Sequence, residues 1–214
     1  MIKGVLFDMD GVLVDSEPFI CKAAIMMFNE LGIKVLPEDF LPFVGTGENR
    51  YIGGVADKYG LNVDIEKVKS RTYEIFEIIV RGKLSPHPGA YEFIAYCRNR
   101  GLKLALATSA DKVKMEINLR ETGLSQNSFQ EIITGLDVVN KKPFPDIYLK
   151  AAESLGLQPN ECLVVEDAVN GVKAGKTAGC RCLALTTSFN ASELHEADWI
   201  CESLIKVPGK VLNW

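Results

Sequence analysis

The sequence predicts an α/β protein in which a doubly wound, Rossmann-like parallel sheet carries an inserted helical cap. Short apolar runs alternate with amphipathic stretches along most of the chain, and one long helical block interrupts this alternation after the first run. A short run that is apolar on both faces is typical of a buried parallel strand. Strands that alternate with helices favour right-handed crossovers in one doubly wound sheet.

Five such runs are the predicted strands, at 2–7, 102–107, 131–134, 162–165 and 181–185. The helices expected to cover this sheet are at 90–100, 112–122, 146–155 and 168–178. Each of these four stretches is followed at or near its end by a glycine, the residue that most readily ends a helix in a left-handed conformation: Gly101, Gly123, Gly156 and Gly179.

The interrupting block has helical patterns and no convincing strand, with helices expected at 19–31, 37–43, 49–59 and 65–80. We therefore predict an inserted α-helical cap at 16–83 and an α/β core at 1–15 and 84–214. The two crossings, near 14–16 and 83–88, would act as hinges for a lid over the core.

Composition excludes several classes of protein. The 24 Lys and Arg residues against 28 Asp and Glu give a net charge of −4, the wrong sign for a nucleic-acid groove. No run approaches the length of a membrane span, and the N-terminal stretch is too short and too acidic for a signal peptide. Six scattered cysteines without a Cys-x-x-Cys pair indicate reduced thiols. We therefore expect a cytoplasmic protein, and a monomer, that binds neither nucleic acid nor membrane.

Polar residues follow four of the predicted strands, at the point where each strand ends. In a doubly wound sheet the ligand binds beyond the carboxyl ends of the strands, so these side chains should meet at one rim. They are Asp8 and Asp10, then Thr108 and Ser109, then Lys142, and finally Glu166 and Asp167.

This set suits phosphoryl transfer. The carboxylates of Asp8, Asp10, Glu166 and Asp167 are hard oxygen ligands, which favour Mg²⁺. We predict Asp8 as the nucleophile that attacks phosphorus and Asp10 as the general acid and base. Thr108 and Lys142 would donate hydrogen bonds to the phosphoryl oxygens. Each residue taken singly could instead be a helix cap or a solvated loop residue, but their occurrence after four strands favours a site.

Four segments carry a resemblance to a known family: FDMDGVLVDSE at 7–17, ATSA at 107–110, KKPFPD at 141–146 and VVEDAVNGVKAG at 164–175. The chain resembles the haloacid-dehalogenase-like phosphohydrolases, in their β-phosphoglucomutase and phosphatase branch. The resemblance implies Asp8 as nucleophile, Asp10 as acid and base, and Thr108 and Lys142 at the phosphate. Ser109, which follows Thr108, is a further candidate for binding the phosphate. It also implies Mg²⁺ held by Asp8, the Asp10 carbonyl, Asp167 and Glu166, under a helical cap.

The cap is expected to determine specificity through a glycine-containing loop that opens a helix. Its candidate substrate-binding residues are Thr46, Glu48, Asn49 and Arg50, and Arg50 suits a substrate phosphate or carboxylate. The alternative is that Thr46 or Asn49 caps the helix and Arg50 is solvated.

One departure from the resemblance affects the predicted reaction. β-Phosphoglucomutase-like members have a histidine shortly after the first motif, where this chain has Phe19, Ile20 and Cys21. Hydrolysis is therefore favoured over mutase activity. The sequence predicts a Mg²⁺-dependent phosphatase acting on a small phosphorylated metabolite such as a sugar phosphate, through an aspartyl-phosphate. The alternatives are a phosphomutase and a non-catalytic binding module on the same fold.

Overall fold

A computed structural model describes residues 1–214 and has a six-stranded parallel sheet at its centre, with strand order β3-β2-β1-β4-β5-β6. The strands are β1 (Gly4–Phe7), β2 (Lys103–Ala107), β3 (Glu131–Ile133), β4 (Cys162–Glu166), β5 (Arg181–Leu185) and β6 (Trp199–Cys201). The strand order reverses direction at β1, which pairs with both β2 and β4. The carboxyl end of β1 is therefore the topological switch point, where doubly wound sheets bind ligands.

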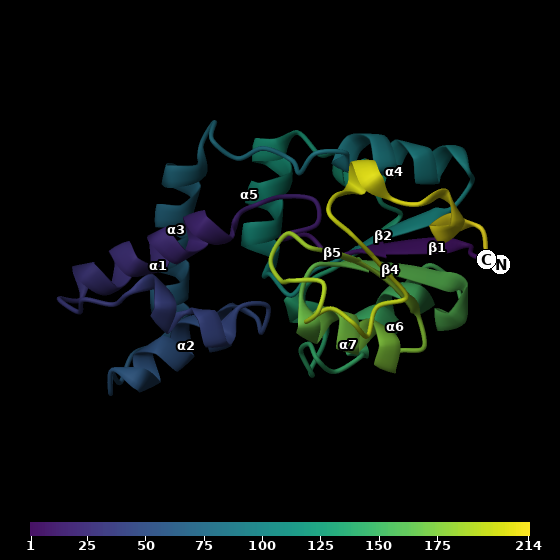
Figure 1. Ribbon diagram of the computed structural model, residues 1–214. Helices are drawn as coiled ribbons and strands as arrows, with labels where there is room; N and C mark the ends of the chain where they lie inside the picture. Colours follow the sequence, from purple (N-terminus) through teal and green to yellow (C-terminus); the bar gives the residue numbers. More distant parts are fainter.

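Both faces of the sheet are covered by helices, which confirms the predicted fold class (Figure 1). Alternate residues of a strand point to opposite faces. Thus Val5 and Phe7 pack with the side of the sheet that α4 (Ala90–Asn99) and α5 (Lys112–Thr122) cover. Leu6 packs instead with α6 (Asp146–Ser154) and α7 (Val169–Thr177) on the other face.

Three further helices pack together beyond one end of the sheet, between β1 and β2 in the chain (Figure 1). They are α1 (Glu17–Glu30), α2 (Glu48–Lys58) and α3 (Ile65–Val80), with the short 3-10 helices η1 (Pro37–Asp39) and η2 (Leu41–Phe43) between α1 and α2. Within this unit the aromatic ring of Phe40 packs against the rings of Phe28 and Tyr51. We call this helical unit the cap; its exact limits, 16–83, stay a prediction.

The cap is linked to the core by the chain crossings and by ion pairs. Val14 and Pro86 form a β-bridge, and the His87 amide donates a hydrogen bond to the Leu13 carbonyl, so the two crossings lie side by side. The Lys69 ammonium of α3 lies 2.9 Å from the Asp111 carboxylate, directly before α5.

The structure differs from the expected elements in three places. Residues 37–43 form two 3-10 helices in place of an α-helix, because Pro42 would stand inside that helix without an N–H to donate. β6, with only three residues, was not predicted because its run is too short to show a strand pattern. The C-terminal tail, where no element was expected, contains the 3-10 helix η7 (Gly209–Leu212), and Val211 and Leu212 are buried.

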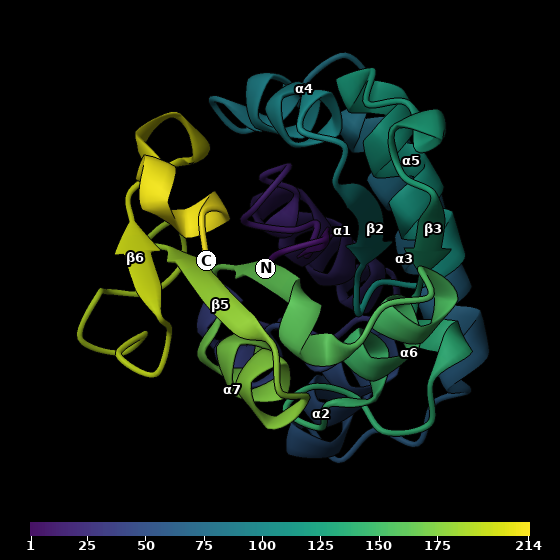
Figure 2. The same cartoon turned by 90° about the vertical axis from the view of Figure 1, so that its right-hand side faces the viewer.

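Figure 2 views the sheet from the end that lies away from the cap, and it shows both chain termini near the middle strands. The Ile2 amide donates a hydrogen bond to the Trp214 carbonyl, which joins the termini. All six cysteines are free thiols. None of the helices combines the length and apolar character that crossing a lipid bilayer requires.

Candidate active site

Asp8 lies immediately after β1 and is buried, with only 7% of its surface exposed. The Lys142 ammonium donates a hydrogen bond to Asp8 Oδ1 at 2.6 Å and another to Glu166 Oε1 at 2.6 Å. Burial raises the pKa of Asp8 to about 7, although the nearby Lys142 charge opposes this rise. Lys142 is thus the cation that favours an ionised Asp8, as a nucleophile requires.

Glu166, the last residue of β4, has both carboxylate oxygens engaged by donors within the protein. Oε1 also accepts from the Tyr148 hydroxyl at 2.8 Å, and Oε2 accepts from the Asp167 and Ala168 amides at 2.8 and 2.9 Å. The pKa of Glu166 is lowered, because Lys142 and these hydrogen bonds outweigh the cost of its burial. Glu166 is therefore an ionised residue that positions Lys142.

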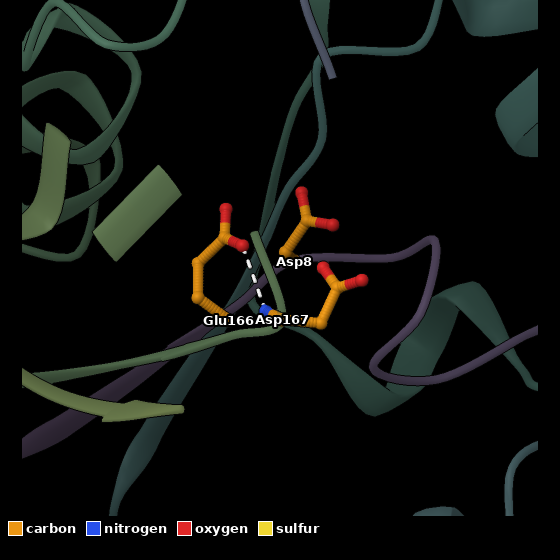
Figure 3. Close-up of side chains that lie close together, drawn as sticks. All are labelled: Asp8, Glu166 and Asp167. Atoms are coloured by element: carbon orange, nitrogen blue, oxygen red, sulfur yellow. Dashed lines mark hydrogen bonds between the residues drawn. The ribbon is translucent and has the colours of Figure 1, made fainter. Parts of the chain in front are cut away.

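Asp8, Glu166 and Asp167 form an acidic cluster in which one carboxylate oxygen of each residue lies within 4.8 Å of the others (Figure 3). Burial, together with the charges of Glu166 and Asp8, raises the pKa of Asp167 well above its ordinary value. Three buried carboxylates thus share one ammonium group, which leaves excess negative charge at Asp8 and Asp167. This excess, and the hard oxygen donors, fit a divalent cation such as Mg²⁺.

Asp10 lines the same cavity as Asp8, and donors from α5 and from Ser16 hold its carboxylate. Its Oδ2 accepts a hydrogen bond from the Lys114 ammonium at 3.0 Å. Its Oδ1 accepts from the Ser16 hydroxyl and, at 3.3 Å, from the Asn118 amide. These three donors hold the Asp10 carboxyl in place, and its roles in proton transfer and metal binding stay predictions.

Gly11 allows the turn after β1 to pass close to the acidic cluster. Its φ is +76°, and a Cβ atom there would lie 1.9 Å from Asp167 Oδ2. The Thr187 hydroxyl, following β5, donates to the Gly11 carbonyl at 2.6 Å and so ties this turn to the core. Only glycine combines this left-handed conformation with the close approach.

Thr108 and Ser109 follow β2 and line the same cavity as Asp8 and Lys142, so the structure brings all the predicted core residues to one rim. The Thr108 side chain is buried, and its hydroxyl accepts a hydrogen bond from the Ala110 amide at 3.1 Å. The alternative that these residues cap the next helix does not hold, since α5 begins after Asp111. The cavity measures about 60 Å³.

Of the four predicted cap residues, only Glu48 lines this cavity. The Thr46 hydroxyl donates to the Phe43 carbonyl, and the Asn49 amide oxygen accepts from Lys69 at 2.7 Å. Arg50 is exposed and its guanidinium lies 5.3 Å from the centre of the Phe43 ring. The structure therefore does not bring Thr46, Asn49 or Arg50 together with the core residues.

Several further polar residues at the site were not among the sequence candidates. Asn118 and Tyr148 donate to Asp10 and Glu166, and five others line the cavity: Glu17, Tyr51, Lys114, Asn170 and Ser188. Lys114 and Asn118 are four residues apart on α5, so they share a helix face. The neighbouring Met115 and Leu119 are apolar, which indicates that this helix face is buried, and a buried lysine needs a charged partner. The sequence therefore contained a usable signal that Lys114 belongs to a polar site. Tyr148 gave no signal beyond that of a core aromatic residue.

The switch-point location, the nucleophile candidate beside a lysine and the surplus of buried carboxylates define a hydrolase that acts on phosphate esters. Comparison with known families agrees: the model of the haloacid dehalogenase-like hydrolases matches residues 5–185. The chain belongs to this family.

Individual relatives place the chain more closely, in the β-phosphoglucomutase-like branch. It is 33% identical to the phosphorylated carbohydrates phosphatase of Thermotoga maritima, covering 99% of this chain and 97% of that one. It is 43% identical over 202 residues to the protein SUPPRESSOR OF QUENCHING 1, chloroplastic, of Arabidopsis thaliana. This match covers 92% of the present chain but only 19% of the plant protein.

The fold is also similar to that of CbbY from Rhodobacter sphaeroides. Its crystal structures in complex with phosphate and with xylulose-(1,5)bisphosphate superpose with TM-scores of 0.89 and 0.89, at 27% and 27% identity. The matches cover 100% and 99% of both chains, so the likeness includes the cap as well as the sheet.

Proposed function

We propose that this protein is a Mg²⁺-dependent phosphatase that removes a phosphoryl group from a small phosphorylated metabolite, such as a sugar phosphate, through an aspartyl-phosphate on Asp8. The observation that carries the proposal is the pair of 2.6 Å hydrogen bonds by which Lys142 joins Asp8 to Glu166, next to Asp167. The names of relatives that act on phosphorylated carbohydrates support this substrate class.

In the proposed reaction an Asp8 carboxylate oxygen attacks phosphorus while the bond to the leaving oxygen breaks. Asp10 gives its proton to that oxygen and then takes a proton from the water that cleaves the aspartyl-phosphate. Lys142 and the Thr108 hydroxyl donate hydrogen bonds to the phosphoryl oxygens. Lys114 and Asn118 hold the Asp10 carboxyl in place between these two proton transfers.

Asp8, Asp167 and the Asp10 carbonyl are the residues we propose to hold Mg²⁺. When bound, the ion neutralises the phosphoryl oxygens and offsets the repulsion between them and Asp8. Glu166 would act through its hydrogen bonds to the amide of Asp167 and to Lys142, since both of its oxygens already have donors.

The proposed cap at 16–83 would open to admit the substrate. A cavity of about 60 Å³ is smaller than the cavity of about 150 Å³ that accommodates benzene, so it is too small for a sugar. The adjacent crossings at Val14 and Pro86 are suitable hinges. A cytoplasmic location and a monomeric state stay predictions from the sequence.

A test compares hydrolysis of p-nitrophenyl phosphate with and without Mg²⁺ by the wild type and the Asp8→Asn variant. Turnover that requires Mg²⁺ and is lost in the variant supports the phosphatase. A phosphomutase would interconvert sugar phosphate isomers without net phosphate release. It would need a side chain that assists transfer to a second sugar hydroxyl, and Ile20 at the cavity wall cannot exchange a proton. A binding module would show no turnover on any phosphate ester.

A further inference from the structure

The cap side of the cavity is acidic. Glu17 and Glu48 are the first residues of α1 and α2, and both line the cavity that also contains Asp8 and Asp10. Neither residue has a role in the phosphoryl transfer proposed above. Both lie near Asp10, which protonates the leaving oxygen in the proposed reaction. The rest of the leaving group would therefore lie beside Glu17 and Glu48.

One oxygen of each carboxylate is buried without a hydrogen-bond donor. These are Oε2 of Glu17 and Oε2 of Glu48. Glu48 is only 7% exposed, and its nearest cation is the Lys114 ammonium, 3.6 Å from Oε1. Buried polar atoms almost always have partners, because leaving one unpaired is costly. Two such oxygens on one cavity wall indicate that a ligand supplies the missing donors.

The cations of the cavity are already paired. Lys142 is shared by Asp8 and Glu166, and Lys114 contacts Asp10. No arginine or histidine lines the cavity. A second phosphate on the substrate would therefore face Glu17 and Glu48 without a free cation, and a buried charge that lacks a partner is costly.

We propose that Glu17 and Glu48 are specificity-determining residues that accept hydrogen bonds from hydroxyl groups of the leaving group. They thereby select monophosphates of neutral polyhydroxylated compounds against bisphosphates. This inference rests on the phosphatase function proposed above and adds the class of substrate. Hydroxyl groups fit better than an ammonium group, because Lys114 already supplies a positive charge between the cap and Asp10.

The test compares wild type, Glu48→Gln and, as a matched control, Glu38→Gln, which changes an exposed glutamate elsewhere on the cap. The substrates, all with Mg²⁺, are sorbitol, ribitol and glycerol monophosphates, fructose bisphosphate, phosphoethanolamine and p-nitrophenyl phosphate. Glutamine keeps the size of the side chain and removes its charge. The measured quantity is kcat/KM for each substrate.

The wild type should prefer the best polyol monophosphate to fructose bisphosphate by about 10-fold or more. Glu48→Gln should lower kcat/KM for that polyol monophosphate by about 10- to 100-fold, the effect of losing a hydrogen bond to a charged acceptor. The same variant should lower kcat/KM for p-nitrophenyl phosphate less, so the ratio of polyol monophosphate to p-nitrophenyl phosphate hydrolysis should fall by about 10-fold, since that leaving group has no hydroxyl to bind. Glu38→Gln should match the wild type on every substrate.

Three results would overturn the inference. Fructose bisphosphate could be the better substrate of the wild type, phosphoethanolamine could be preferred to every polyol monophosphate, or Glu48→Gln could reduce all substrates equally. The last result would show that Glu48 only positions Lys114.

If p-nitrophenyl phosphate is not hydrolysed at all, the phosphatase proposal fails, and calorimetric binding then tests the inference separately. Glu48→Gln should weaken sorbitol monophosphate binding by about 10-fold, and unchanged binding would contradict it.

Discussion

The Lys142 ammonium lies 2.6 Å from Asp8 Oδ1, although the two residues are 134 positions apart in the sequence. Both side chains are buried, and the same ammonium contacts Glu166. The sheet topology makes this contact possible, because β1 lies between β2 and β4 and its carboxyl end faces the loop that precedes α6. One cation thus holds the proposed nucleophile and its neighbouring carboxylate together.

Replacing Lys142 by Met should destabilise the protein as well as inactivate it. The change leaves Asp8 and Glu166 buried without their cation, which should lower the free energy of unfolding by about 3–5 kcal/mol. Urea denaturation at neutral pH with EDTA measures this. Lys150→Met, at an exposed position of α6, is the control and should stay within about 0.5 kcal/mol of wild type. A Lys142→Met variant as stable as this control would show that the buried pair needs no cation.

Replacing Asp167 by Asn should raise the melting temperature of the metal-free protein and abolish its response to Mg²⁺. Burial and the Glu166 and Asp8 charges make ionised Asp167 unfavourable, so a neutral amide removes that cost. Thermal unfolding in EDTA and in Mg²⁺ gives both quantities. Asp57→Asn, an exposed change on α2, should keep the wild-type Mg²⁺ response. An Asp167→Asn variant still stabilised by Mg²⁺ would place the ion elsewhere.

The pH dependence of stability should reveal the raised pKa of Asp8. Its pKa is about 7 in the folded protein against 3.8 for an unperturbed aspartate, so the folded state binds this proton more tightly than the unfolded state. The Asp8 contribution to stability is therefore present at low pH and is lost as pH rises from about 4 to about 7. Without metal, the stability advantage of Asp8→Asn over wild type should grow across this window. A constant difference would contradict the shift.

Replacing Gly11 by Ala should lower activity through a steric conflict that the same replacement at Gly32 does not create. Gly11 and Gly32 both have φ of +76°, but an added Cβ meets Asp167 Oδ2 at 1.9 Å only at Gly11. Both variants should lose about 1 kcal/mol of stability from the left-handed backbone. Only Gly11→Ala should lose hydrolysis of p-nitrophenyl phosphate, by about 10-fold or more, because Asp167 is displaced. Equal activity of the two variants would mean that this close approach has no catalytic consequence.

The core of the site was predictable because its residues directly follow strands. The ends of parallel strands meet at one rim, so the sequence alone predicts that Asp8, Thr108 and Asp167 lie close together, as they do. The sheet itself followed from apolar runs, apart from β6, which is only three residues long.

The cap side of the site was not predictable in the same way. Which residue of a loop faces the core depends on how the cap sits on it, and here Gly47 approaches the Ser109 backbone. This packing turns Glu48 into the cavity and leaves Arg50 outside, over Phe43. The prediction of Arg50 rested on its charge, because an arginine suits an anionic substrate. The sequence does not show in which direction its side chain points.

Trapping the covalent intermediate tests the central claim most directly. The protein is mixed with p-nitrophenyl phosphate and Mg²⁺, quenched during turnover, treated with borohydride, which reduces an aspartyl-phosphate to homoserine, and mapped by peptide mass spectrometry. We predict homoserine at position 8, and none there when substrate is omitted. Continued turnover with an unmodified Asp8 peptide, or homoserine at Asp10 or Asp167, would contradict the assignment of Asp8 as the nucleophile.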